Sequence, residues 1–161
     1  MFEIDRAVIE INGGCNYTCQ MCPQTNADGS TGARGKSWLK KMPLDMFEDA
    51  VKQCAEAGGL NVVNLEGSGE ATLNSDLPLY IEIVKKYGAK SYIFSNGFRM
   101  RGKFMQDCVD AGLDFFRFSV IGYNAEKYKE WMNSSNFDKV IQNLNEMQQY
   151  VNKTNASTEV A

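Results

Sequence analysis

Short apolar runs alternate along the chain with segments whose apolar residues recur at helical spacing, with a period of about 30–40 residues. The expected strands are residues 7–11, 61–65, 91–94 and 115–120. Helices are expected from Leu44 to just before Gly58, from Ser75 and Asp76 to Gly88, from about Phe104 to Gly112, and from beyond the last strand to Val151 with an interruption at Ser134 and Ser135. Strands that alternate with helices predict an α/β fold with a parallel sheet.

Four strand–helix units are too few for a closed eight-unit barrel. Glu159, Val160 and Ala161 are expected to begin a fifth strand. Because proteins avoid leaving a hydrophobic strand edge unpaired, we expect the fold to be incomplete at its C-terminal end, within one domain over residues 1–161. The alternative is a self-contained small α/β sheet.

The composition excludes several classes of partner. The chain has 161 residues, of which 43% are hydrophobic, and a formal net charge of −3. This balance gives no electrostatic case for binding nucleic acid or an anionic membrane. No apolar run approaches the roughly 18 residues of a membrane span, and the acidic start does not resemble a signal peptide. We therefore expect a cytoplasmic location, in a reducing compartment.

Three of the five cysteines lie close together, in the run N-G-G-C-N-Y-T-C-Q-M-C-P after the first expected strand. Cys15, Cys19 and Cys22 offer three thiolates from one short loop, which suits a single metal centre. The chain has no histidine, and Cys54 and Cys108 lie on apolar helix faces, where a buried inert thiol is the usual case. An iron–sulfur cluster, a zinc site completed by an acid or one of these two cysteines, and three unligated thiols remain open.

The other unusual loops also follow expected strands. A G-S-G-E turn at residues 67–70 follows the second strand, Ser95–Asn96–Gly97 follows the third, and Ser119 lies near the end of the fourth. Sites in parallel sheets and barrels form at the carboxyl ends of the strands. We therefore expect a metal centre, a glycine-rich turn with a carboxylate, and a serine–asparagine pair to surround one site at the carboxyl ends of the strands.

The C-x3-C-x2-C motif after a first strand resembles the radical S-adenosylmethionine (SAM) superfamily. The G-S-G-E turn is similar to that family's Gly-Gly-Glu element, and S-N-G to its ribose-contacting stretch, so the resemblance extends from Cys15 to the last helix. It implies a partial (βα)6 TIM-like barrel with four βα units, a [4Fe–4S] cluster and SAM. It also implies an enzyme that cleaves SAM to methionine and a 5′-deoxyadenosyl radical, which abstracts hydrogen from an unidentified small-molecule or peptide substrate. The implied reductant is a protein such as flavodoxin or ferredoxin.

By this resemblance, each cysteine of the motif would ligate one iron, and SAM would chelate the fourth. The glycine turn would hold the methionine ammonium group, with glycines that allow close backbone approach and unusual φ angles, and the serine–asparagine pair would bind the ribose hydroxyls. Ser119 would reach the methionine carboxylate; Arg117 is a second candidate, although an ion pair within the protein is favoured for it. The implied cofactor-binding residues are Met21, Gly67, Ser68, Gly69, Glu70, Ser95, Asn96 and Ser119, and the implied metal ligands are Cys15, Cys19 and Cys22.

The sequence departs from the family pattern in three places. Met21, which would lie near the adenine, stands where the family often has an aromatic residue. Ser68 replaces the first glycine of the usual pair, and Ala71 stands where a proline often follows the glutamate. The M-C-P sequence resembles the subgroup of molybdenum-cofactor biosynthesis enzymes and peptide-modifying enzymes with a SPASM extension. Residues 24–37 are expected to form a flexible loop, with a substrate lid that uses Arg34 as the alternative. The non-catalytic alternatives are an electron-transfer iron–sulfur domain, a zinc-stabilised interaction domain and an inactive fragment.

Overall fold

The computed structural model describes residues 3–26 and 40–161, and in this part of the chain it forms one five-stranded sheet. All neighbouring strands are parallel, and the order β1-β2-β3-β4-β5 follows the sequence. The strands are β1 (Arg6–Val8), β2 (Val62–Asn64), β3 (Lys90–Ser95), β4 (Phe115–Phe118) and β5 (Glu159–Val160). The four expected strands are confirmed, and so is the start of a fifth. The expected lid residue Arg34 lies outside the described residues.

The helices also fall where the apolar spacing predicts them. They are α1 (Leu44–Glu56), α2 (Leu77–Lys86), α3 (Gly102–Asp110), α4 (Ala125–Met132) and α5 (Phe137–Thr154), with a short 3₁₀ helix η2 (Ala71–Leu73) before α2. Asp76 occupies the N-cap position of α2, but its side chain makes no capping hydrogen bond. The predicted interruption separates α4 from α5, because Asn133 takes the left-handed conformation with a φ of 47° and ends α4.

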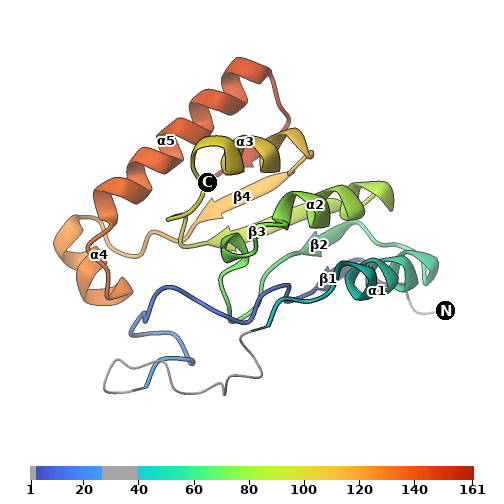
Figure 1. Cartoon of the computed structure of the whole chain (residues 1–161), viewed down its shortest axis with the longest axis horizontal. Helices are drawn as coiled ribbons and strands as arrows, with labels where there is room; N and C mark the ends of the chain where they lie inside the picture. Colours follow the sequence, from blue (N-terminus) through green and yellow to red (C-terminus); the bar gives the residue numbers. More distant parts are fainter. Residues whose placement is uncertain (1–2, 27–39) are drawn as a thin grey trace.

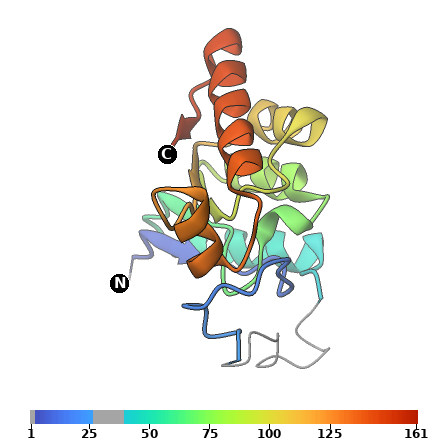
Figure 2. The same ribbon diagram turned by 90° about the vertical axis from the view of Figure 1, so that its left-hand side faces the viewer.

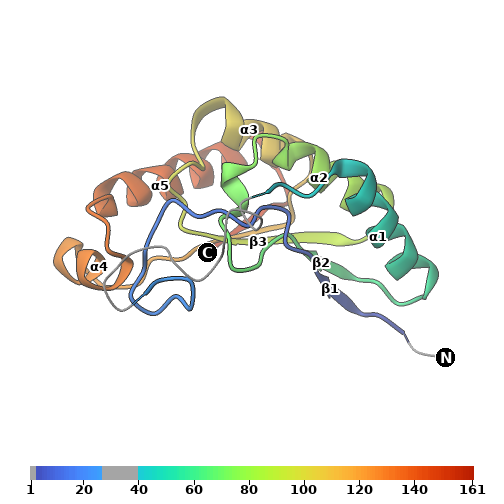
Figure 3. The ribbon, with the colours of Figure 1, turned by 60° about the horizontal axis from the view of Figure 1, so that its bottom comes forward.

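The strand order decides where the helices lie. Because the order never reverses, successive crossovers of one hand place their helices on the same face of the sheet. Figure 3 shows α1, α2, α3 and α5 along one side of the strands, and Figure 1 shows them following one another across the sheet. A doubly wound sheet would carry helices on both faces. The fold is therefore the wall of a barrel, as expected from the resemblance.

The core lies between the sheet and this layer of helices. Val63, Ile93 and Phe116, from the three central strands, are fully buried on the helix side. They belong to the same core cluster as Phe47 of α1 and Ile81 of α2.

Among the described residues, no helix is long and apolar enough to cross a membrane.

The fifth strand is short but properly paired. Phe115 and Phe116 of β4 align with Glu159 and Val160 of β5. The pairing extends to Ala161, whose carbonyl oxygen accepts a hydrogen bond from the Phe118 N–H at 2.8 Å. The sheet therefore continues to the last residue of the sequence.

Two glycines with the same backbone conformation permit a controlled test of packing at the end of β3. Gly97 has a φ of +71°, and a Cβ there would overlap the ring of Phe118, whereas Gly88 has a φ of +75° with open space around its Cβ position. We predict that Gly88→Ala lowers the free energy of unfolding by about 1 kcal/mol, from the left-handed backbone alone. Gly97→Ala should lower it by about 2–4 kcal/mol, because overpacking adds to the backbone cost. Urea denaturation measures both; equal losses would contradict the overlap.

Candidate cofactor site

A cavity of about 210 Å³ lies where the loops after β1, β2, β3 and β4 meet. Nine of the residues singled out from the sequence line it, and Gly67 and Ser68 do not. The nine are Cys15, Cys19, Met21, Cys22, Gly69, Glu70, Ser95, Asn96 and Ser119. The cavity is also lined by Tyr17, Phe94, Ile121 and Met132, which the sequence did not single out. Four loops that are distant in sequence therefore form one site, as expected for the carboxyl ends of parallel strands.

Helix α4 holds the cysteine loop in place. The N–H of Gln20 donates a hydrogen bond to the carbonyl oxygen of Trp131 at 2.9 Å, and Asn133 Nδ2 donates to Thr18 Oγ1 at 2.8 Å. Figure 2 shows the segment after β1 (blue) passing beside α4 (orange). The last turn of α4 thus fixes the middle of the loop that carries the three cysteines.

The three thiols share the cavity, and two of them are shifted in acidity. Burial, as the main cause, raises the pKa of Cys15, and it raises the pKa of Cys19 to about 11, with the charges of the neighbouring cysteines adding to the effect. Both groups are thus neutral thiols at neutral pH in the metal-free protein. They must lose their protons when they bind a metal.

The number and type of the donor groups bear on the kind of metal centre. In residues 3–26 and 40–161, no group of three Cys, Asp or Glu side chains is close enough to hold a single metal ion. A zinc ion needs all four ligands within about 2.0–2.3 Å of itself. In a [4Fe–4S] cluster each thiolate binds a different iron, so the ligands stand further apart. Three thiolates from one loop would give one ligand to each of three irons of such a cluster, whereas a structural zinc site needs a fourth protein ligand.

The remaining two cysteines do not complete a zinc site. Cys108 is buried in α3, where burial raises the pKa of its thiol, and Cys54 is half-buried on α1. Neither residue lines the cavity. The structure therefore gives no support to zinc ligation by either cysteine.

Glu70 is the central hydrogen-bond acceptor of the site. Its side chain is 3% exposed. Its Oε1 accepts from the Thr72 N–H at 3.0 Å, the Thr72 hydroxyl at 2.7 Å and the Ser95 hydroxyl at 2.7 Å. Its Oε2 accepts from the Asn96 N–H at 2.8 Å. The carboxylate is thus satisfied by the protein itself, and it joins the turn after β2 to the end of β3.

Ser95 and Asn96 also have partners within the protein. The Ser95 hydroxyl accepts a hydrogen bond from the Gly97 N–H at 2.9 Å. Asn96 Nδ2 donates to Asn16 Oδ1 at 2.9 Å, and Asn96 Oδ1 accepts from the Phe98 N–H at 3.0 Å. These side chains shape the cavity wall, and their contact with a ribose stays a prediction.

The glycine turn packs against the segment that leads to the cysteines. Glu10 Oε1 accepts hydrogen bonds from the N–H groups of Ser68 at 2.6 Å and Gly69 at 2.9 Å. A Cβ at Gly67 would overlap Glu10, and a Cβ at Gly69 would overlap the carbonyl of Asn12. Neither glycine has a positive φ, so the expected unusual φ angles are wrong. The expected close approach exists, but it is an approach to the chain's own backbone and side chains.

Two residues that support the site were missed from the sequence. Glu10 falls within residues 7–11, the first expected strand, yet β1 ends at Val8 and Glu10 belongs to the loop. Asn143 of α5 is fully buried and donates from Nδ2 to the carbonyl oxygens of Gly97 at 2.9 Å and Phe98 at 3.0 Å. The sequence does carry a signal for Asn143, because a polar residue on the apolar face of the last helix indicates a buried hydrogen bond.

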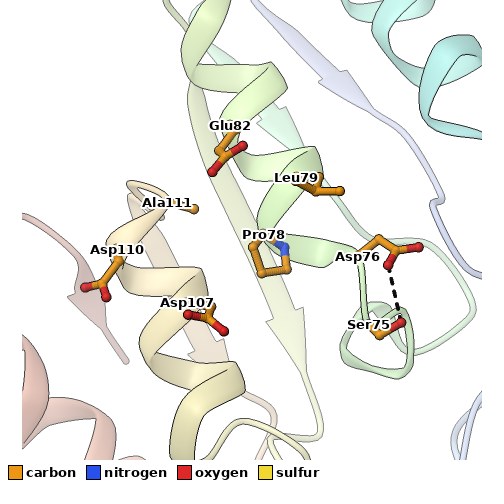
Figure 4. Close-up of a pocket in the computed structure, with 8 residues that line it drawn as sticks. All are labelled: Ser75, Asp76, Pro78, Leu79, Glu82, Asp107, Asp110 and Ala111. Atoms are coloured by element: carbon orange, nitrogen blue, oxygen red, sulfur yellow. Dashed lines mark hydrogen bonds between the residues drawn. The ribbon is translucent and has the colours of Figure 1, made fainter.

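A larger cavity of about 380 Å³ lies between α2 and α3, and Figure 4 shows the acidic residues around it. Asp107 forms an ion pair with Lys103, and Asp110 accepts a hydrogen bond from the Tyr150 hydroxyl at 2.8 Å. No cysteine lines it, and neither does any residue that the sequence predicts to bind a cofactor. Its size alone therefore does not mark it as the functional site.

A family comparison agrees with the site. The model of the radical SAM superfamily matches residues 9–158. The chain therefore belongs to the radical SAM superfamily, and this membership implies a [4Fe–4S] cluster and SAM as cofactors.

Among curated relatives, a probable GTP 3′,8-cyclase of Methanococcus maripaludis is 29% identical over 138 residues, which cover 86% of this chain and 43% of that protein. A probable GTP 3′,8-cyclase of Sulfolobus acidocaldarius is 28% identical over 145 residues, which cover 89% of this chain and 43% of that protein. The chain thus spans less than half the length of these relatives.

Solved structures share the fold. SuiB of Streptococcus suis bound to SAM superposes with a TM-score of 0.74 at 16% identity, over 98% of this chain and 33% of that one. Methylornithine synthase (PylB) superposes with a TM-score of 0.68 at 17% identity, over 96% of this chain and 42% of that one. At these identities the likeness establishes the architecture, which is the partial barrel expected from the sequence.

The Glu70 carboxylate provides a test of the site's internal hydrogen bonds. Both oxygens of Glu70 accept hydrogen bonds in the wild type. In Glu70→Gln, either orientation of the amide therefore places its NH2 group against N–H or O–H donors. We predict a loss of about 1–3 kcal/mol in the free energy of unfolding, because buried donors lose their acceptor. The exposed Glu82 of α2 is the control, and Glu82→Gln should change the stability by less than about 0.5 kcal/mol. Chemical denaturation of both variants checks this, and similar losses would show that Glu70 is not the central acceptor.

Proposed function

We propose that residues 1–161 form the cofactor-binding core domain of a radical SAM enzyme. In this proposal Cys15, Cys19 and Cys22 hold the [4Fe–4S] cluster, and the other residues around the cavity hold SAM. One observation carries the proposal: the three thiols line the same cavity as the ends of β3 and β4 and the turn after β2. A non-catalytic zinc module would need none of these loops around its metal.

The cofactors supply the chemistry, and the chain supplies position. When bound, the cluster and SAM would together supply reductive cleavage of SAM and, from it, hydrogen-atom abstraction from the substrate. The chain contributes the three thiolates, and the hydrogen bonds of Glu70 hold the loops after β2 and β3 in fixed positions. Apolar side chains, including Phe94, Ile121 and Met132, form part of the cavity wall and would shield a bound cofactor from water.

The other assigned residues have positions that support their proposed roles. Met21 lies on the cysteine loop, lines the cavity and is exposed, so it is available to pack against an adenine ring. Ser119 lines the same cavity, and its N–H donates to the carbonyl oxygen of Ser95 at 2.7 Å, which keeps the ends of β3 and β4 together. We assign Ser119 to the methionine carboxylate and Met21 to the adenine.

The proposed activity also requires a partner that delivers electrons. We assign this role to a small reductant protein such as flavodoxin or ferredoxin, in the cytoplasm. A reducing compartment suits a chain whose five cysteines are all free thiols.

Anaerobic reconstitution with iron and sulfide tests the proposal. We predict about four iron ions per chain in the wild type, and a change in the electron paramagnetic resonance spectrum of the reduced cluster when SAM is added. Cys15→Ala, Cys19→Ala and Cys22→Ala should each lose most of the iron, because each removes a ligand. Cys54→Ala is the matched control and should keep it.

Three results would contradict the proposal. Zinc as the only metal bound would favour the structural module, and a spectrum that SAM does not alter would favour an electron-transfer domain. If all three cysteine variants kept their iron, Cys15, Cys19 and Cys22 would not be the cluster ligands.

A further inference from the structure

The face of the sheet opposite the helices carries two arginines that form no ion pair with another described residue. Arg6 of β1 and Arg117 of β4 are both exposed. Neither takes part in an ion pair in the described part of the chain, where the salt bridges all involve lysines. Arg6 Nη1 donates one hydrogen bond, to Asn64 Oδ1 at 3.0 Å. Among the described residues, no partner forms the ion pair that the sequence favours for Arg117.

Both guanidinium groups lie over aromatic rings. The guanidinium carbon of Arg6 is 5.4 Å from the centroid of Tyr92, and that of Arg117 is 5.3 Å from the centroid of Phe94. Phe115 joins the two rings, since it stacks on Tyr92 at 4.9 Å and meets Phe94 edge to face at 5.9 Å. We call Tyr92, Phe94 and Phe115 the aromatic floor. A guanidinium over a ring keeps its N–H groups free for an acceptor in its own plane.

The acid near both arginines is engaged elsewhere. Glu66 Oε1 accepts a hydrogen bond from Asn64 Nδ2 at 2.8 Å, and Glu66 Oε2 accepts from the Phe94 N–H at 2.7 Å. Burial raises the pKa of Glu66, while the charges of Arg6 and Arg117 lower it, so this carboxyl lies within electrostatic reach of both arginines. Glu66 therefore holds the strand ends together, and the donors of Arg117 and those of Arg6 other than the one bound to Asn64 are left to a ligand.

The aromatic floor leads directly to the cofactor cavity. Phe94 belongs to the floor and also lines the cavity. Arg117 is the register partner of Phe94 on the neighbouring strand, and Ser119, two residues further along the chain, lines the cavity as well. A molecule held on the floor would thus have one end at the place where the proposed radical forms.

We propose that Arg6 and Arg117 bind an oxyanion, a carboxylate or a phosphate, of the enzyme's substrate, and that the rest of the substrate lies on the aromatic floor. The inference rests on the proposed function for the reaction that follows binding. Arginine suits this task because its planar fork of N–H groups matches the two oxygens of a carboxylate or phosphate.

Titration of two simple anions into the full chain tests the inference. Inorganic pyrophosphate represents phosphates and succinate represents carboxylates, and nuclear magnetic resonance of the arginine Nε–H groups reports binding. We expect shifts at Arg6 and Arg117 in the wild type. We expect the affinity to fall about tenfold or more in Arg6→Gln and in Arg117→Gln, because each loses charge-assisted hydrogen bonds. The anion that binds more tightly identifies the class of substrate.

Arg101→Gln is the matched control. Arg101 is also exposed and lies over an aromatic ring, that of Phe98 at 5.6 Å, but it precedes α3 and is not part of the open face. This variant should bind both anions as the wild type does. An equal loss in the control, or no binding of either anion to the wild type, would overturn the inference.

SAM affinity, measured on the reconstituted protein, separates this inference from the alternative role of Arg117. We expect both variants of the open face to bind SAM as the wild type does. Weaker SAM binding in Arg117→Gln alone would assign that residue to the methionine carboxylate and overturn the inference. The anion titration needs no cluster, so a failure of cluster assembly would count against the proposed function and leave this test readable.

Discussion

The buried carboxylate of Glu70 is the interaction on which the site depends. It accepts hydrogen bonds from the Thr72 N–H and hydroxyl, the Ser95 hydroxyl and the Asn96 N–H. A buried carboxylate is costly unless such donors surround it, and here they come from two different loops. The loops after β2 and β3 are therefore held in one arrangement by a single group, and the cavity wall is formed before any cofactor binds.

The sheet brings these loops together, and its order explains why one face is available for a substrate. Parallel strands that follow one another in sequence direct all their carboxyl ends to one edge, which gives the cysteine loop, the glycine turn and the ends of β3 and β4 a common position. The same order places the helices on one side (Figure 3). The opposite side keeps Arg6, Arg117 and the aromatic floor accessible beside the cavity.

Much of the site was predictable because its signals are local. The cysteine spacing, the G-S-G-E turn and the S-N-G turn each stand directly after an apolar run, so the position of each loop follows from the strand before it. The supporting residues were harder to predict. Glu10 acts on a turn 58 positions away in the sequence, and Asn143 acts on a turn 46 positions away. No local pattern reports such pairings.

The sequence by itself determined the alternation of strands and helices, the family and the three candidate thiolate ligands, because periodicity and short motifs depend on neighbours along the chain. Only the tertiary structure decided what the polar residues do. It placed Ser95 and Asn96 in hydrogen bonds within the protein, and it explained Gly67 and Gly69 by contact with Glu10 and Asn12 rather than by a left-handed backbone. Within the described part of the chain it also leaves Arg117 without an ion pair, since the nearby carboxylate of Glu66 accepts hydrogen bonds from Asn64 and from the backbone of Phe94. Such choices depend on which groups meet across the fold, and distance along the chain does not record them.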